Sequence, residues 1–167
     1  MRKIVCFILT AIVLAGCFSI DCPVNNLVYT NYELKKGDGT PDTLNTDSLW
    51  IFIRRAGDDT LTVRVNALTG KSASSFSLDI SYTQPEDEFY LVLRDTAKEQ
   101  HQWVDTFRIR KENYPHFESV DCKAAYFHDL TGTMTTHHII DSITIQHSHV
   151  DYEITNTHLY MYLKPRR

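Results

Sequence analysis

The apolar residues of this chain recur with a period of two, and this alternation constrains the fold more than any other feature of the sequence. Successive side chains of an extended strand point to opposite faces, so a period of two predicts a strand with one buried face. Leu61, Val63 and Val65 are predicted to face the core, with Arg64 in water. The pattern predicts eight strands and a ninth candidate: residues 48–54, 60–66, 75–81, 88–94, 103–110, 121–128, 139–146 and 158–163, with 27–32 as the ninth.

Residues that favour turns separate these strands. Gly, Pro and Asp cluster at residues 36–41, 56–59 and 84–87, and the second cluster lies between two clear strand patterns, as in a hairpin. The sequence has no amphipathic helical pattern of useful length. Short strands at hairpin spacing predict an all-β fold: a single antiparallel β-sandwich of eight or nine strands with an immunoglobulin-like Greek key. A β-barrel is the alternative.

The first 16 residues have the composition of an export signal. Arg2 and Lys3 precede about a dozen mostly apolar residues, fewer than the roughly 20 that span a bilayer as a helix. A basic start, a short apolar run and small residues are typical of a secretory signal peptide. The segment Leu14-Ala15-Gly16-Cys17 resembles the bacterial lipobox, which implies cleavage before Cys17 and lipid attachment to its thiol. An ordinary signal peptide with a plain Cys17 is the alternative.

These features divide the chain into a lipoprotein signal peptide at 1–16, a lipidated N-terminus and short tether at 17–22, and a β-sandwich domain at 23–167. Removing 16 of the 167 residues leaves a mature chain of 151, which fits one domain. One acyl chain holds a protein only marginally, at about 0.8 kcal/mol per buried CH2, so a stable anchor needs more than one. The lipobox resemblance implies two or three chains.

The mature chain is mildly acidic. The signal holds two of the 17 basic residues and none of the 21 acidic ones, so the mature net charge is −6 with His neutral. A nucleic-acid binder needs a basic patch or stripe, so no nucleic-acid partner is expected. The lipid, rather than attraction to anionic headgroups, is expected to hold the protein on its membrane.

The four cysteines have separate expected fates. Cys6 leaves with the signal and Cys17 takes the lipid, so Cys22 and Cys122 remain. Export permits disulfides, and two cysteines have one intramolecular pairing, so we expect a Cys22–Cys122 bond. Five residues of extended chain span at most about 18 Å, so this bond would hold the folded body close to the lipid.

Two histidines and an aspartate near the end of the chain have a spacing that could suit metal ligands. His147, His149 and Asp151 would project from one face of a strand, within reach of a zinc ion. The segment also looks like a strand end that runs into a turn, where exposed histidines are ordinary. We therefore expect no metal and no cofactor, while the sequence leaves a metal at His147 and His149 open.

No pattern in the chain identifies catalytic residues. The nucleophile elbow G-x-S-x-G is missing. Ser119, with His116 and Asp121 nearby in the sequence, has the residue types of a catalytic triad. Closeness along the chain does not show that these side chains meet in space. Two carboxylates from distant strands could serve a glycosidase without leaving a local mark. The expectation is a protein that is not an enzyme, with a small hydrolase as a remote alternative.

Aromatic residues are numerous, with nine Tyr and two Trp. Core and strand-pair packing is the ordinary interpretation, although tyrosine clusters also stack on sugars or form protein interfaces. Tyr160 and Tyr162 share a face opposite Leu159, Met161 and Leu163, so the last strand is a candidate contact surface.

Several segments together resemble a known family. They are Asp21-Cys22-Pro23, the stretch from Pro115 to Cys122, Phe127-His128, Thr136-His137, the stretch from Ile140 to Ile143, and the stretch from His158 to Tyr162. The chain is similar to the uncharacterised Bacteroidetes lipoprotein family labelled domain of unknown function 6452. This resemblance implies a lipid-anchored, all-β envelope protein. It brings no known activity, so no catalytic residue is implied.

The sequence thus predicts a non-enzymatic cell-envelope lipoprotein, attached to the membrane through its covalent lipid, that binds or scaffolds an envelope protein or a glycan. A carbohydrate-binding accessory module is the alternative. Residues 18–21 lack the acidic cluster that surface-exported lipoproteins of these bacteria tend to show. That favours the periplasmic side of the outer membrane.

Overall fold

The computed structural model describes residue 22 and residues 27–54, 60–70, 73–95 and 101–166. The predicted signal peptide at 1–16, the lipid-bearing Cys17 and the predicted turn at 56–59 lie outside the described residues. No helix in the described part of the chain is long and apolar enough to cross a membrane.

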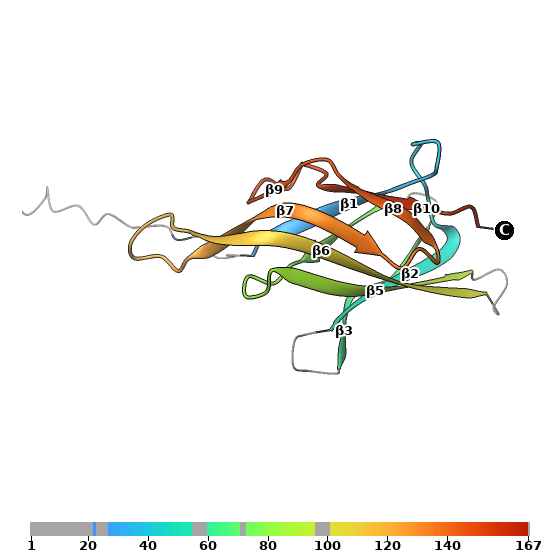
Figure 1. The fold of residues 1–167 in the computed structure, drawn as a ribbon, viewed down its shortest axis with the longest axis horizontal. Helices are drawn as coiled ribbons and strands as arrows, with labels where there is room; N and C mark the ends of the chain where they lie inside the picture. The colour runs from blue at the N-terminus through green and yellow to red at the C-terminus, as the bar shows by residue number, and fades with distance from the viewer. Residues whose placement is uncertain (1–21, 23–26, 55–59, 71–72, 96–100, 167) are drawn as a thin grey trace, which may run out of the picture.

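The described residues form two packed sheets, so the predicted all-β sandwich is confirmed (Figure 1). Ten strands are present in this part of the chain, one more than the nine candidates, because a two-residue strand follows β8. The strands are β1 (Tyr29–Lys35), β2 (Asn45–Arg54), β3 (Leu61–Gly70), β4 (Ser75–Asp79), β5 (Glu86–Asp95), β6 (Gln102–His116), β7 (Ala125–Thr135), β8 (Ile140–Ile145), β9 (His149–Val150) and β10 (Leu159–Leu163).

The strand order shows how the chain moves between the two layers. One sheet has the order β4-β1-β10-β8 and the other has the order β3-β2-β5-β6-β7-β9. The first and last strands, β1 and β10, pair in parallel, and the other pairs are antiparallel. This arrangement differs from the four and three strands of an immunoglobulin constant domain, because six strands share one sheet.

The core follows the alternation of the sequence. Most strands bury alternate side chains against the opposite sheet, and fully burying one large apolar side chain stabilises the fold by about 1.5–3 kcal/mol. The alternate apolar residues of β2, β5, β6 and β10 are buried. They include Leu49, Ile51, Ile53, Phe89, Leu91, Leu93, Phe107, Ile109, Leu159, Met161 and Leu163.

The predicted orientation of β3 is wrong for its first residues, although Val65 does pack against the core. Leu61 and Val63 were expected in the core but are 42% and 47% exposed. The β2–β3 register shifts three times, and Val63 comes to lie opposite Phe52, whose neighbours Ile51 and Ile53 point inward. Arg64, expected in water, instead pairs with Asp79 of β4 at 3.2 Å. The reason is that β3 is an edge strand, where register shifts and twist reorient side chains.

Two predicted boundaries are also wrong. The strand expected at 121–128 begins only at Ala125, because Cys122 lies in the connection between β6 and β7. The turn expected at 84–87 is partly strand, since β5 starts at Glu86 and Asp87 is buried.

Candidate functional site

The predicted disulfide joins Cys22 to Cys122, with the two Cα atoms 5.4 Å apart. Cys122 lies in the loop at 117–124, because the β6–β7 ladder ends with His116 opposite Ala125. Figure 1 shows the β6–β7 hairpin extending past the other strands at one end of the sandwich, with the C-terminus at the other end. We call the first end the disulfide end. The bond places Cys22, five residues beyond Cys17, at this end.

Large apolar side chains are exposed at the disulfide end. Within the 117–124 loop, Phe117 is 61% and Val120 is 97% exposed. Tyr82, 55% exposed, stacks on Tyr126 of β7 with ring centroids 4.7 Å apart. Leu27 follows Cys22 by five residues and is 54% exposed. The loop and its surroundings therefore present apolar and aromatic surface beside the disulfide.

Aromatic rings pack against one another next to the 117–124 loop. His116 stacks on Phe127 with centroids 4.2 Å apart, and Tyr152 meets Phe127 edge-on at 5.1 Å. Tyr114 and His149 lie with near-parallel rings at 6.2 Å. Contacts of this kind stabilise by about 0.5–1.5 kcal/mol each beyond their buried area. They hold β6 and β7 against β9 and the segment that follows it.

The two histidines considered as metal ligands, His147 and His149, contact protein groups in the structure. His149 places Nδ1 at 2.8 Å from Asp129 Oδ1 and Nε2 at 3.9 Å from Asp151 Oδ2. His147 is exposed, and its backbone N–H donates to the carbonyl of His158 at 3.3 Å. Across the described residues, no group of three or more His, Cys, Asp or Glu has an arrangement that could hold a metal ion.

The triad written from sequence is not assembled. His116 Nε2 lies 3.1 Å from Glu118 Oε1. The hydroxyl of Ser119 instead faces the backbone N–H of Asp121, at 3.5 Å. A nucleophile must be in hydrogen-bond reach of its base, and the observed partner of His116 is a carboxylate rather than that hydroxyl.

A buried carboxylate links the two sheets. Asp105 of β6 is 1% exposed, and its Oδ2 accepts the backbone N–H groups of His138, Ile139 and Ile140 at 2.9, 2.9 and 2.8 Å. The hydroxyl of Thr136 donates to Oδ1. Burial by itself would raise the pKa of Asp105, but these hydrogen bonds outweigh it and lower the pKa below its usual value. The charge organises the crossover from β7 to β8.

A buried ion pair joins β5 to β6. Lys111 Nζ lies 2.5 Å from Asp87 Oδ2 and donates to the carbonyl of Gln84 at 2.9 Å. Both side chains are almost completely buried, at 0% and 4% exposure. Burial raises the pKa of Asp87 although Lys111 acts against that shift. Breaking such a pair leaves an uncompensated buried charge, so its role is structural.

Sequence reasoning missed both charged groups, yet the signal was present. Asp105, Phe107, Ile109 and Lys111 occupy alternate positions of β6, so all four point inward. Asp87 stands two residues before Phe89 in the same inward row of β5. A charged residue in the apolar phase of a strand predicts a buried partner.

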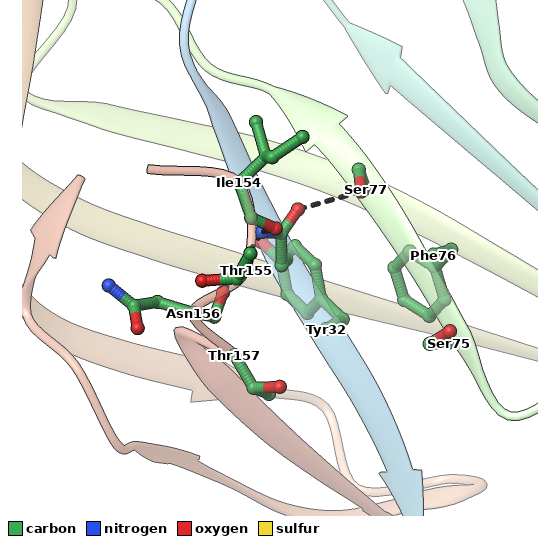
Figure 2. A pocket seen from close by; sticks show the side chains of 9 residues that line it. Tyr32, Ser75, Phe76, Ser77, Ile154, Thr155, Asn156 and Thr157 are labelled. Atoms are coloured by element: carbon green, nitrogen blue, oxygen red, sulfur yellow. Dashed lines mark hydrogen bonds between the residues drawn. The ribbon is translucent and has the colours of Figure 1, made fainter. Parts of the chain in front are cut away.

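The described surface also has a cavity between the two edges of β1. Its volume is about 370 Å³, and its wall comes from β1, β4 and the segment before β10 (Figure 2). Neutral hydroxyl and amide side chains form most of the wall: Asn31, Ser75, Ser77, Thr155, Asn156 and Thr157. None of the nine lining residues carries a carboxylate or an imidazole. The cavity therefore presents polar groups without a charged acid or base.

Asn31 organises this cavity. Its Nδ2 donates to the carbonyls of Ile154 and Asn156, each at 2.9 Å, and its Oδ1 accepts from Ser77 at 2.7 Å. Figure 2 shows Ile154, Asn156 and Ser77 in the wall of the cavity. One amide thus fixes the segment before β10 against β1 and β4.

The outer face of the six-stranded sheet is apolar near its centre. Trp50 lies opposite Val92, which lies opposite Val104, and Phe52 lies opposite Val63. These five side chains define what we call the outer apolar face. Val63 and Val104 are 47% and 48% exposed, and the other three are half-buried. Contiguous exposed apolar surface marks contact sites more often than scattered single residues do.

The chain matches a known protein family over more than half of its length. Residues 48–163 match a family described as a family of unknown function, DUF6452. The chain belongs to this family. The DUF6452 match begins within β2 and ends at the last residue of β10, so it includes the outer apolar face, Asp105 and Cys122, whereas Cys22 and β1 precede it. Searches of curated proteins and of solved structures found no significant match.

Proposed function

We propose that this chain is a Bacteroidetes envelope lipoprotein, acylated at Cys17 and held on the periplasmic side of the outer membrane. The signal pattern of 1–16 and the lipobox-like residues before Cys17 support export and acylation. The absence of an acidic cluster at 18–21 favours the periplasmic leaflet. The observation that carries the proposal is the disulfide, because Cys22 is bonded into the body five residues after Cys17. An acylated Cys17 then keeps the sandwich within about 18 Å of the lipid attachment.

Mass spectrometry of the natural protein tests the anchor directly. We expect the mature chain to start at Cys17 and to carry the added mass of two or three acyl chains. Cys17→Ser should abolish that mass and release the protein from the membrane fraction. Cys6→Ser is the matched control, since this cysteine leaves with the signal. An unmodified Cys17 or an intact leader on the natural protein contradicts the proposal.

The body is proposed to be a non-enzymatic module that binds or scaffolds an envelope protein. The outer apolar face supports this function, because a flat apolar sheet surface fits a protein partner better than a small solute.

Crosslinking in intact cells followed by mass spectrometry tests the partner. We expect one abundant envelope protein to be recovered with the wild-type chain. Val104→Glu should reduce that recovery, because it places a charge in the outer apolar face. Thr144→Glu adds the same charge at an exposed position of β8, in the other sheet, and should leave the recovery unchanged. Equal recovery with both variants rules out this face as the contact.

Carbohydrate binding is the second candidate, and the neutral polar wall of the cavity favours it. Hydroxyl and amide groups are suited to hydrogen-bond an uncharged polyhydroxylated ligand. A glycan array with the Cys17→Ser protein provides the test. Binding that is lost in Thr157→Arg, which fills the cavity, but kept in Thr144→Arg would favour this function. No bound glycan rejects it.

A further inference from the structure

The apolar surface at the disulfide end lies unusually close to the proposed lipid. Val120 is two residues from Cys122, so its Cα lies within about 7 Å of that cysteine. The disulfide brings the Cα of Cys22 to 5.4 Å from that of Cys122, and Cys17 is five residues away, at most about 18 Å of chain. The disulfide and the two short chain segments therefore confine Val120, the most exposed apolar residue of the loop, to within about 30 Å of Cys17.

We propose that the 117–124 loop rests in the interfacial layer of the bilayer, with Phe117 and Val120 inserted between headgroups. This inference rests on the proposed acylation of Cys17. Apolar side chains that lie in the interface become buried about 5–10 Å deep at the boundary between headgroups and acyl chains. Phe117 and Val120 are 61% and 97% exposed, so insertion would remove most of their apolar surface from water.

The neighbouring rings fit the same environment. Tyr82, more than half exposed, stacks on Tyr126 beside the hairpin. Tyrosine concentrates at membrane–water interfaces because its ring is apolar and its hydroxyl is polar. Leu27, on the tether side, adds a further exposed apolar side chain.

The charges near the loop decide the kind of lipid surface. Glu118 and Asp121 are acidic, whereas Lys123 is basic, so the loop has no cationic excess to attract anionic headgroups. The occupant is therefore the zwitterionic bilayer that already holds the acyl chains, rather than an anionic lipid recognised by charge.

This contact would orient the whole molecule. The hairpin tip would point into the membrane and the C-terminal end away from it, since the two lie at opposite ends of the sandwich (Figure 1). The outer apolar face lies on a sheet face rather than at the tip, so it would remain open to a partner beside the anchored protein.

The test uses a fluorescent probe on the acylated full-length mature chain. Of the four native cysteines, Cys6 is removed with the signal, Cys17 is acylated, and Cys22 and Cys122 are bonded to each other. An introduced cysteine therefore supplies the free thiol for labelling. Phe117→Cys is labelled with the environment-sensitive dye NBD and reconstituted in vesicles of phosphatidylcholine and phosphatidylethanolamine. Lys36→Cys, in the exposed turn after β1, is the control.

We expect the dye at residue 117 to shift its emission to shorter wavelength and to be quenched by doxyl-labelled lipid, while the dye at 36 does neither. A second measurement avoids the label: hydrogen exchange of the unlabelled protein should slow in residues 117–123 on vesicles relative to Cys17→Ser in solution. An aqueous spectrum at residue 117 together with unchanged exchange overturns the inference. Mass spectrometry of the same sample separates the two proposals, because acylated protein with a solvated loop refutes only this one, whereas protein without acyl mass refutes both.

Discussion

At the scale of single residues, the buried carboxylate of Asp105 links the two sheets to each other. Asp105 collects three backbone N–H groups at the start of β8 while it sits in β6 of the opposite sheet. Hydrogen bonds to an ionised acceptor contribute about 1.5–3 kcal/mol, and leaving a buried donor without a partner costs about 1–3 kcal/mol. Such a group specifies where the crossover lies as well as stabilising it.

Asp105→Asn should lower the free energy of unfolding by about 2–4 kcal/mol, because an amide keeps the shape but removes the charge. The folded pKa of Asp105 is lowered, so its contribution is present above the unfolded pKa near 3.9 and is lost as pH falls through the folded value. Urea unfolding at pH 7 measures the loss. Asp141→Asn, exposed in β8, is the control and should change little; equal effects of both variants would refute this role.

His128 is predicted to make the protein less stable in mild acid. Burial, with a smaller effect of Lys111, lowers the pKa of His128 from 6.5 to about 4. The unfolded chain therefore binds a proton near pH 6.5 that the folded chain refuses until about pH 4, and stability falls across that interval by up to about 3 kcal/mol. His128 Nδ1 donates to Asn113 Oδ1 at 2.6 Å, since the Asn113 amide nitrogen is directed to Gln84.

His128→Gln should flatten this pH dependence, measured by urea unfolding at pH 7 and pH 5. Part of the slope will remain, because burial also lowers the pKa of His158. Exposed His147→Gln is the matched control and should retain the wild-type slope. A wild-type slope in the His128 variant contradicts the assignment.

At the scale of elements, the parallel pairing of β1 with β10 places the first and last strands of the domain side by side, and the segment after β10 makes further contacts. Lys164 donates through its backbone N–H to Ile139 at 2.8 Å. Arg166 reaches Asp42 at 2.8 Å and Asp47 at 2.7 Å, both in or beside the connection from β1 to β2. Burial raises the pKa of Asp47 even with Arg166 present. This arginine therefore neutralises two poorly solvated carboxylates.

Arg166→Ala should lower the free energy of unfolding by about 2 kcal/mol at pH 7, because it leaves both carboxylates without their cation. The loss should shrink toward pH 4, where the raised pKa of Asp47 allows protonation. Arg110→Ala removes an ion pair with Glu86 at 2.8 Å, in which the Arg110 side chain is 58% exposed. Exposed pairs contribute about 0–1 kcal/mol, so thermal and urea unfolding should rank Arg166 well above Arg110.

At the scale of the whole molecule, one covalent bond spans most of the chain. The disulfide joins residues 100 positions apart, so the enclosed segment runs from β1 through β6. Closing a loop of that length restricts the unfolded chain, and this restriction is the main source of stabilisation in the chain-entropy account. The same bond sets the distance between the body and Cys17.

Cys122→Ser with Cys22→Ser should lower the free energy of unfolding by about 2–5 kcal/mol, measured by urea unfolding of the non-acylated Cys17→Ser protein. Reducing agent should destabilise the parent by a similar amount and leave the double variant unchanged. A parent protein indifferent to reductant would show that the bond does not form.

The inward row of β2 was predictable from its alternation, whereas that of edge strand β3 was not. Leu49, Ile51 and Ile53 are buried as expected, because β2 has neighbours on both sides that hold its pleat in one phase. Val63 in edge strand β3 is exposed because register shifts against β2 turn it outward. The candidate loop with Phe117 and Val120 could not be recognised before the disulfide partner and the hairpin ends were known.

The sequence by itself determined the strand periodicity, the export and lipobox pattern, and the single pairing left to Cys22 and Cys122. These are local or combinatorial properties, readable because side-chain direction alternates with each residue. Only the tertiary structure decided that β1 pairs in parallel with β10, that Asp105 accepts backbone N–H groups at the start of β8, and that Cys22 is bonded into the loop that exposes Val120. Those outcomes depend on contacts between segments far apart in the chain, which a local pattern does not encode.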